Sequence, residues 1–172
     1  MTDKTRIRWG ILGTANIARA ALIPALQSSR NADVVAVASR DTERAFSVAT
    51  RFNIPTSYGT YDALLADPNV DIVYVPLPNS LHAPWVLRAI AAGKHVLCEK
   101  PLGLSAAEWL SMADAAEARG VHLMEAFMYR FHPQIDALVT LVDEGAVGEL
   151  RHMHASFTFR LARPDNIRLQ SD

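Results

Sequence analysis

The residues with the clearest chemical potential are an acid, a base and a proline within the stretch His95–Leu102. The apolar run at its start follows the turn residue Gly93 and stops at Pro101, which predicts a short buried strand, because proline cannot donate to a sheet. A lysine at such a strand tip, here Lys100, is desolvated on one side and open to a crevice on the other. In an open parallel sheet that edge binds ligands, so Lys100 is a candidate ligand-contacting cation beside Glu99. A surface turn is the alternative interpretation.

A second chemical feature follows the apolar strand predicted at Ile7–Leu12. The order of strand, tight turn and helix is that of a dinucleotide-binding fold, in which free N–H groups at the helix start bind a pyrophosphate. Gly13 holds the first position of the glycine fingerprint, and Ala15 and Ala18 hold the second and third. Alanine at the third position still allows close packing, whereas Ala15 places a methyl group where the pyrophosphate approaches. A tight structural turn is the alternative explanation.

A hydroxyl and a guanidinium follow the second predicted strand, Asp33–Ala38. In NAD enzymes an acid at this edge usually binds the ribose 2′-hydroxyl. Ser39 and Arg40 instead suit a 2′-phosphate, and the guanidinium plane can cover the adenine. The pair therefore favours NADP, with NAD possible, over the alternative of a solvated arginine at a helix start. Asp41 is expected to cap the helix that runs through Phe52.

The elements that must position these groups follow one pattern. Strands alternate with helices six times in about 125 residues, which predicts an α/β fold with a doubly wound parallel sheet, the Rossmann fold. Asn79 is expected to cap a helix over Ser80–Ala92, and Ser105 opens a capping box before a helix that Gly120 ends. The other strands are expected at residues 56–58, 71–75 and 121–124 and in the stretch after Gly93.

The pattern changes after the sixth strand. A helix is predicted after Pro133, and Leu150–Leu161 alternates polar and apolar residues with the period of a half-buried strand. We therefore expect a Rossmann domain over residues 1–125 and the start of a second, α+β domain over residues 126–172. An apolar strand edge without a partner predicts self-association or partial disorder beyond about residue 145.

The histidines of that last predicted strand, His152 and His154, share its polar face. A metal pair is conceivable there, but no third ligand lies nearby, so a solvated or ligand-facing pair is the better interpretation and no metal site is expected.

Composition narrows the classes of partner. The chain has 172 residues, half of them apolar, with 17 basic and 18 acidic residues and a net charge of −1. Because no basic block exists, nucleic acid and anionic membranes are not expected as partners. The single cysteine, Cys98, allows no internal disulfide. The N-terminus has no long apolar segment, so neither a signal peptide nor a spanning helix is expected, and the predicted location is the cytoplasm.

Several of these motifs together resemble the Gfo/Idh/MocA oxidoreductases. The similar motifs are the turn Gly13–Ala18, Pro78-Asn79 with His82, the run Ala92–Val96, and Glu99-Lys100-Pro101. Two longer stretches, Tyr74–His82 and Met124–Pro133, resemble one branch of that family, which holds glucose–fructose oxidoreductase, NADP-linked D-xylose dehydrogenase and dimeric dihydrodiol dehydrogenase. The resemblance covers nearly the whole chain.

The resemblance implies a binding role for each matching residue. The pyrophosphate would lie on the turn formed by Gly13, Thr14, Ala15, Asn16 and Ile17, and Ser39 and Arg40 would select NADP. Glu99 would fix the nicotinamide ribose, and Lys100, before a cis bond to Pro101, would touch the reacting hydroxyl. The ribose and nicotinamide would be lined by Leu77, Pro78, Asn79 and His82, and the cofactor and substrate cleft bordered by Glu125, Ala126 and Arg130.

The resemblance also implies a reaction. Hydride would pass between NADP and the hydroxyl-bearing carbon of a small sugar or vicinal diol, with Lys100 stabilising the developing alkoxide. Such enzymes are longer, act as homodimers or larger oligomers, and place a glycine pair and a catalytic tyrosine soon after the Asn166–Arg168 region. This chain ends at Asp172, so residues 126–172 would start a substrate and dimerisation domain that is mostly missing. The chain is then either a fragment or a cofactor-binding half. A non-catalytic NAD(P)-binding module, sensor or co-regulator is the alternative function.

Overall fold

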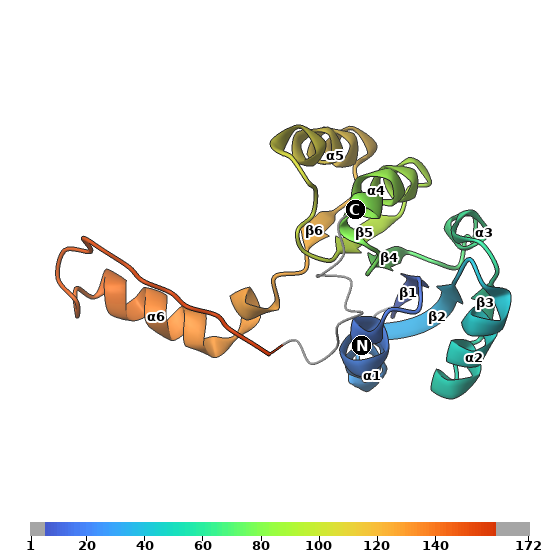
Figure 1. The fold of residues 1–172 in the computed structure, drawn as a ribbon, viewed down its shortest axis with the longest axis horizontal. Helices are drawn as coiled ribbons and strands as arrows, with labels where there is room; N and C mark the ends of the chain where they lie inside the picture. The colour runs from blue at the N-terminus through green and yellow to red at the C-terminus, as the bar shows by residue number, and fades with distance from the viewer. Residues whose placement is uncertain (1–5, 161–172) are drawn as a thin grey trace, which may run out of the picture. The chain divides into compact units, whose positions relative to one another are not determined.

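The computed structural model describes residues 6–160. The chain divides into two compact units, Met1–Ala126 and Phe127–Asp172. Figure 1 shows the elements of both units. No helix among the described residues is both long and apolar enough to cross a membrane.

The first unit is built on a six-stranded sheet whose neighbouring strands all pair in parallel. The spatial order is β3-β2-β1-β4-β5-β6. The chain therefore begins at the central strand β1, adds β2 and β3 on one side, and then adds β4, β5 and β6 on the other side. This reversal between β1 and β4 is the switch point at which open α/β sheets bind ligands. The predicted doubly wound sheet is confirmed, with strands β1 (Ile7–Leu12), β2 (Ala32–Ala38), β3 (Thr56–Tyr58), β4 (Ile72–Val75), β5 (His95–Cys98) and β6 (Leu123–Glu125).

Helices cover both faces of this sheet (Figure 1). One apolar cluster packs α3, α4 and α5 against one face, and a second packs α1 and α2 against the other. Alternate residues of β4 enter alternate clusters, which explains why its sequence is an uninterrupted apolar run rather than an alternating one. The helices are α1 (Ile23–Ser28), preceded by the π-helical turn η1 (Ala18–Leu22), α2 (Thr42–Phe52), α3 (Tyr61–Leu65), α4 (His82–Ala91), preceded by the 3₁₀ turn η2 (Asn79–Leu81), and α5 (Ala106–Arg119).

Two of the three predicted helix caps are present in the structure. The Asp41 carboxylate accepts from the Arg44 N–H at 3.1 Å, and the Ser105 hydroxyl accepts from the Glu108 N–H at 3.2 Å, as predicted. The cap predicted at Asn79 is wrong. Residues 79–81 instead form a 3₁₀ turn in which the Leu81 N–H donates to Pro78 O at 2.8 Å, so α4 begins only at His82.

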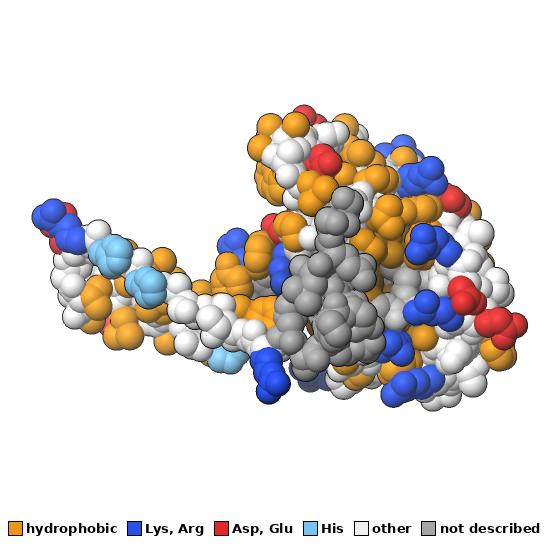
Figure 2. All heavy atoms as spheres, in the orientation of Figure 1, with side chains coloured by type: hydrophobic (Ala, Val, Ile, Leu, Met, Phe, Trp, Pro, Cys, Tyr) orange, Lys and Arg blue, Asp and Glu red, His pale blue; other side chains and the backbone are white. Residues whose placement is uncertain are grey.

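The second unit contains the 3₁₀ turn η3 (Met128–Phe131) and the helix α6 (Pro133–Asp143), which confirms the helix predicted after Pro133. The strand predicted at Leu150–Leu161 is wrong over residues 150–160, which contain no strand, and Leu161 lies outside the described residues. A strand needs a neighbour to pair its N–H and C=O groups, and no strand of the second unit's described part offers one. Hydrophobic side chains of α6 also remain about half exposed (Figure 2). Self-association through this unit stays a prediction.

Polar contacts join the amino ends of the central strands β1 and β4. Arg8 donates to both Asp71 carboxylate oxygens, from Nη2 at 2.6 Å and from Nε at 3.0 Å, and its N–H donates to the same carboxylate at 2.9 Å. The buried Lys94 ammonium donates to Asp67 O at 2.6 Å and to Val70 O at 2.8 Å. The hydrogen bonds from Arg8 hold the pKa of the Asp71 carboxyl below its usual value. The two strands that flank the switch point are thereby held together at the edge opposite to the predicted site.

The lowered pKa of Asp71 predicts an acid dependence of stability. A carboxyl group whose pKa is lower in the folded chain stabilises it above the unfolded pKa of about 4, and this contribution disappears as the pH falls through the folded pKa. We expect Asp71→Asn to reduce the loss of free energy of unfolding between about pH 5 and pH 3, measured by urea unfolding. The control is Asp62→Asn, because Asp62 pairs with Arg88 at the exposed surface. Equal pH slopes for wild type and Asp71→Asn would contradict the prediction.

Candidate cofactor and catalytic site

The turn after β1 is shaped by Gly13. Its φ of +102° lies in the region that favours glycine, and a Cβ there would lie 3.0 Å from Leu77 Cδ2. The Gly13 N–H donates to Ala38 O at 2.8 Å, which ties the turn to the end of β2. Within residues 6–160 the N–H groups of Thr14, Ala15 and Asn16 have no hydrogen-bond partner. Free donors at a helix start are groups that can bind an anion, and the pyrophosphate-binding role of this turn stays a prediction.

The end of β2 places Ser39 and Arg40 beside this turn. Ser39 is 7% exposed, and its hydroxyl accepts from the Asp41 N–H at 3.2 Å, so the side chain is fixed in a local turn. Arg40 is exposed, and within the described part of the chain its guanidinium has no ion-pair or hydrogen-bond partner. A free guanidinium next to an anion-binding turn is suited to a phosphate group.

Glu99 follows β5 directly and is tied to the neighbouring strand β4. Its N–H donates to Val75 O at 3.1 Å, which extends the strand pairing by one residue. The Tyr74 hydroxyl donates to Glu99 Oε1 at 2.7 Å. Burial, and next the bond to Glu99, raise the pKa of Tyr74 far above its ordinary value, so the hydroxyl keeps its proton and acts as the donor. Glu99 is therefore a half-buried carboxylate whose Oε1 is engaged and whose Oε2 has only a long contact, 3.4 Å, with the Lys100 N–H.

The backbone beyond Lys100 is held by side chains of two other elements, α4 and β6. The Lys100–Pro101 peptide bond is cis, as the family resemblance implied. The two ring nitrogens of His82 lie 2.7 Å from Pro101 O and 2.8 Å from Leu77 O. On the other side, the Leu102 N–H donates to Glu125 Oε1 at 2.8 Å. Side chains from the start of α4 and the end of β6 thus fix residues 101 and 102.

Lys100 itself is exposed at this fixed position. Among residues 6–160 no carboxylate or carbonyl group accepts a hydrogen bond from its ammonium group. The cation is thus free to interact with a ligand, whereas Lys94, the other lysine of this part of the chain, is buried and bound to backbone carbonyls. This contrast singles out Lys100 as the chemically available lysine of the edge.

The chain matches the family model described as an oxidoreductase family with an NAD-binding Rossmann fold, over residues 7–127. It belongs to the Gfo/Idh/MocA oxidoreductase family. The chain is 50% identical over 165 residues to D-xylose 1-dehydrogenase (NADP(+)) 2 of Haloferax volcanii, covering 95% of this chain and 50% of that protein. It is 45% identical over 158 residues to mouse trans-1,2-dihydrobenzene-1,2-diol dehydrogenase, covering 91% and 47%.

Solved structures show the same relationship. The 3-ketoreductase KijD10 from Actinomadura kijaniata, in complex with TDP-benzene and NADP, superposes with a TM-score of 0.80 at 43% identity, over 84% of this chain and 46% of that one. The chain therefore spans about half the length of the Gfo/Idh/MocA proteins that it matches.

Most of the predicted site residues of this family member meet at the carboxyl edge of the sheet. They follow β1, β2, β4, β5 and β6, and the Ala126 N–H donates to Cys98 O at 2.8 Å. His82 lies beneath this edge, fully buried, so it acts on the site through Leu77 and Pro101. Arg130 belongs to η3 of the second unit, and its role at the cleft stays a prediction.

The residue that sequence reasoning missed is Tyr74. It belonged to a motif of the resemblance but not to the predicted site, because a tyrosine in a buried strand usually contributes only packing. The available signal was a hydroxyl-bearing side chain inside the otherwise aliphatic strand β4.

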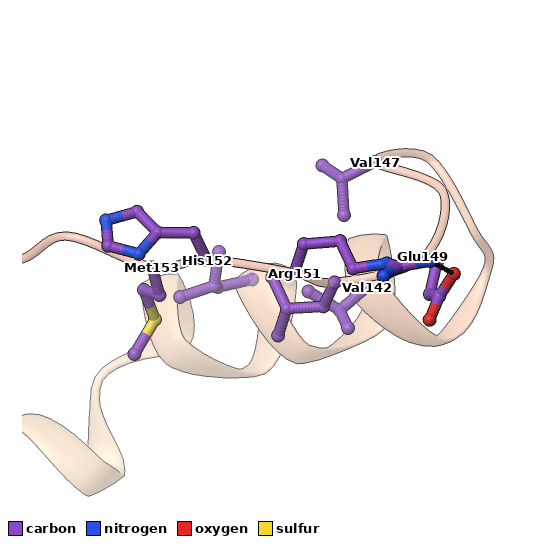
Figure 3. Close-up of a pocket in the computed structure, with 8 residues that line it drawn as sticks. Val142, Val147, Glu149, Arg151, His152 and Met153 are labelled. Atoms are coloured by element: carbon purple, nitrogen blue, oxygen red, sulfur yellow. Dashed lines mark hydrogen bonds and ion pairs between the residues drawn. The ribbon is translucent and has the colours of Figure 1, made fainter.

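A separate hollow of about 370 Å³ lies in the second unit, between α6 and residues 147–153 (Figure 3). None of the predicted site residues lines it. Its lining is mostly apolar and consists of Leu138, Val142, Val147, Glu149, Leu150, Arg151, His152 and Met153.

The buried ring of His82 predicts a large effect on stability. His82→Ala removes the ring from two partly buried backbone carbonyls and the donor from at least one of them, at a cost of about 1–3 kcal/mol, and also leaves a cavity. We expect the free energy of unfolding, measured in urea, to fall by about 2 kcal/mol or more. His154→Ala is the control, because His154 is exposed, and it should change that free energy by less than about 0.5 kcal/mol. Equal effects of the two substitutions would contradict the assigned role of His82.

Proposed function

We propose that this chain carries the cofactor-binding part of an NADP-dependent oxidoreductase that transfers hydride between nicotinamide and the hydroxyl-bearing carbon of a sugar or vicinal diol. One observation carries the proposal. A turn with unpartnered N–H groups, a free guanidinium and a free lysine ammonium lie at the same edge of one doubly wound sheet. The names of the relatives support the same chemistry, since they include an NADP-linked sugar dehydrogenase, a diol dehydrogenase and a ketoreductase bound to NADP.

The residues present fit NADP. The unpartnered N–H groups after Gly13 would bind the pyrophosphate, and the absence of a Cβ at Gly13 leaves room for Leu77 to pack on the turn. Arg40 would pair with the 2′-phosphate, and the nicotinamide half would lie along Leu77, Pro78 and the carboxylate of Glu99. When bound, NADP supplies or accepts the hydride at its nicotinamide ring.

Lys100 would act on the substrate oxygen. A cation within hydrogen-bond reach of that oxygen stabilises the negative charge that develops on it during hydride transfer. The backbone clamp formed by His82 and Glu125 holds residues 101 and 102, so the position of Lys100 is set before a substrate binds. The general base, the substrate contacts, the assembly as a homodimer or larger oligomer and the cytoplasmic location remain predictions.

A second candidate function is a non-catalytic NAD(P)-binding module. It is supported by the free N–H groups after Gly13 and the free guanidinium of Arg40, which would bind a dinucleotide whether or not a reaction follows. Both proposals predict binding of the nucleotide, so turnover decides between them. An activity screen with aldoses and vicinal diols separates them: tight binding without turnover by the protein that carries this chain would favour the module.

The role of Arg40 predicts the choice of cofactor. Hydrogen bonds between charged groups contribute about 1.5–3 kcal/mol, so Arg40→Ala should weaken NADP binding by about tenfold or more and leave NAD binding within about twofold. Isothermal titration calorimetry of the 172-residue chain measures both affinities. Arg51→Ala, which removes an arginine from the last turn of α2, is the control and should change neither. Equal losses for NADP and NAD would contradict the assignment.

The role of Lys100 predicts a loss of turnover without a loss of cofactor. In the protein that carries this chain, Lys100→Met should lower kcat at saturating NADP by about 100-fold or more, because a preorganised charge at the developing alkoxide contributes at least that factor. NADP affinity should stay within about twofold, because Lys100 acts on the substrate oxygen. Lys100→Arg should restore part of the lost activity. Near-normal turnover by Lys100→Met would show that Lys100 is not the catalytic group.

A further inference from the structure

The Tyr74 hydroxyl is the polar end of a side chain that is otherwise enclosed by apolar groups. Tyr74 lies on the central strand β4, opposite Ile11 of β1 and Leu97 of β5, and is 1% exposed. Its ring belongs to the apolar cluster under α1 and α2. A buried hydroxyl without a partner would be costly, and within residues 6–160 its partner is the Glu99 carboxylate. The hydrogen bond to Glu99 therefore allows the Tyr74 side chain to be buried in this apolar cluster.

The two oxygens of Glu99 are in different situations. Oε1 accepts from the Tyr74 hydroxyl at 2.7 Å, whereas the contact of Oε2 is the Lys100 N–H at 3.4 Å, which is long for a hydrogen bond. A carboxylate held at one oxygen by a rigid donor has a fixed plane. Its other oxygen can then accept a hydrogen bond from a ligand in one defined direction, and such bonds to charged acceptors are stronger than neutral ones.

We propose that Tyr74 is a positioning residue that holds Glu99 through its hydroxyl, so that the free Glu99 oxygen accepts from the nicotinamide ribose hydroxyls. The inference rests on the proposed function, because it takes the ligand at Glu99 to be the ribose of a nicotinamide cofactor. It assigns to Tyr74 an effect on only one half of the dinucleotide. The adenosine half would be bound at the ends of β1 and β2 and would not depend on Tyr74.

Tyr74→Phe tests the inference, because it removes the hydroxyl and keeps the buried ring. We expect NADP binding to weaken about three- to tenfold, since the carboxylate loses its orientation but not its charge. Adenosine 2′,5′-bisphosphate, which lacks the nicotinamide ribose, should bind within about twofold of wild type. Titration calorimetry of the 172-residue chain gives both affinities. Should Tyr74→Phe fail to fold, Tyr74→Met, which has no hydroxyl and fills irregular core space, replaces it.

A double-mutant cycle shows whether Tyr74 acts through Glu99. If it does, Tyr74→Phe combined with Glu99→Gln should weaken NADP binding no more than Glu99→Gln alone. Tyr58→Phe is the matched control, because the Tyr58 hydroxyl donates to the Asp67 carboxylate at 3.0 Å, away from Glu99. It should leave both affinities unchanged.

The possible outcomes separate the two proposals. Equal weakening of NADP and the bisphosphate, no weakening of either, or additive effects in the cycle would overturn the role of Tyr74 alone. Failure of the wild-type chain to bind NADP would overturn the proposed function, and the inference with it. Selective weakening of NADP with a non-additive cycle is the result expected if Tyr74 positions Glu99.

Discussion

The site depends on a fixed backbone at residues 100–102. A loop at the end of a sheet normally has many conformations, and ordering each residue costs about 1–2 kcal/mol in backbone entropy. Here the Pro101 carbonyl faces the buried His82 ring, and the Leu102 N–H is bound by Glu125. Because unpaired polar groups in such an environment are unfavourable, alternative loop conformations are disfavoured. The exposed Lys100 is thus supported by groups that do not themselves need to touch a ligand.

The distribution of charge at this edge follows from the same contacts. The carboxylates of Glu99 and Glu125 each have one oxygen engaged, by the Tyr74 hydroxyl and the Leu102 N–H respectively. The cations Lys100 and Arg40 are exposed and unpaired within the described residues. An edge whose carboxylates are engaged and whose cations are unpaired favours anionic ligands and developing negative charge. That is the requirement of a dinucleotide phosphate and of an alkoxide.

The features that could be predicted from the sequence are local ones. The apolar runs gave the six strands, and the caps at Asp41 and Ser105 follow from hydrogen bonds that span three residues. The glycine at position 13 was predictable from its turn, but its close approach to Leu77 joins segments 64 residues apart in numbering (77 − 13) and has no local signature. The bond between Tyr74 and Glu99 is hidden for the same reason, since it depends on the register of two strands.

The two errors have a common physical cause. A helix cap at Asn79 and a strand at Leu150–Leu161 were inferred from side-chain types. Whether either one forms depends instead on which partners the backbone N–H and C=O groups find. At Asn79 the chain satisfies its backbone by a 3₁₀ turn that starts at Pro78. In the 150–160 segment an alternating pattern can form a strand only where a second strand is available.

The geometry of the edge also limits which group can remove a proton during the proposed reaction. Lys100 is a cation and stabilises negative charge, so it cannot at the same time accept the proton of the substrate hydroxyl. Of the two nearby carboxylates, Glu125 is bound to the Leu102 N–H, and Glu99 has only the oxygen that the proposal assigns to the ribose. The proton acceptor of the proposed reaction is therefore a group other than Lys100.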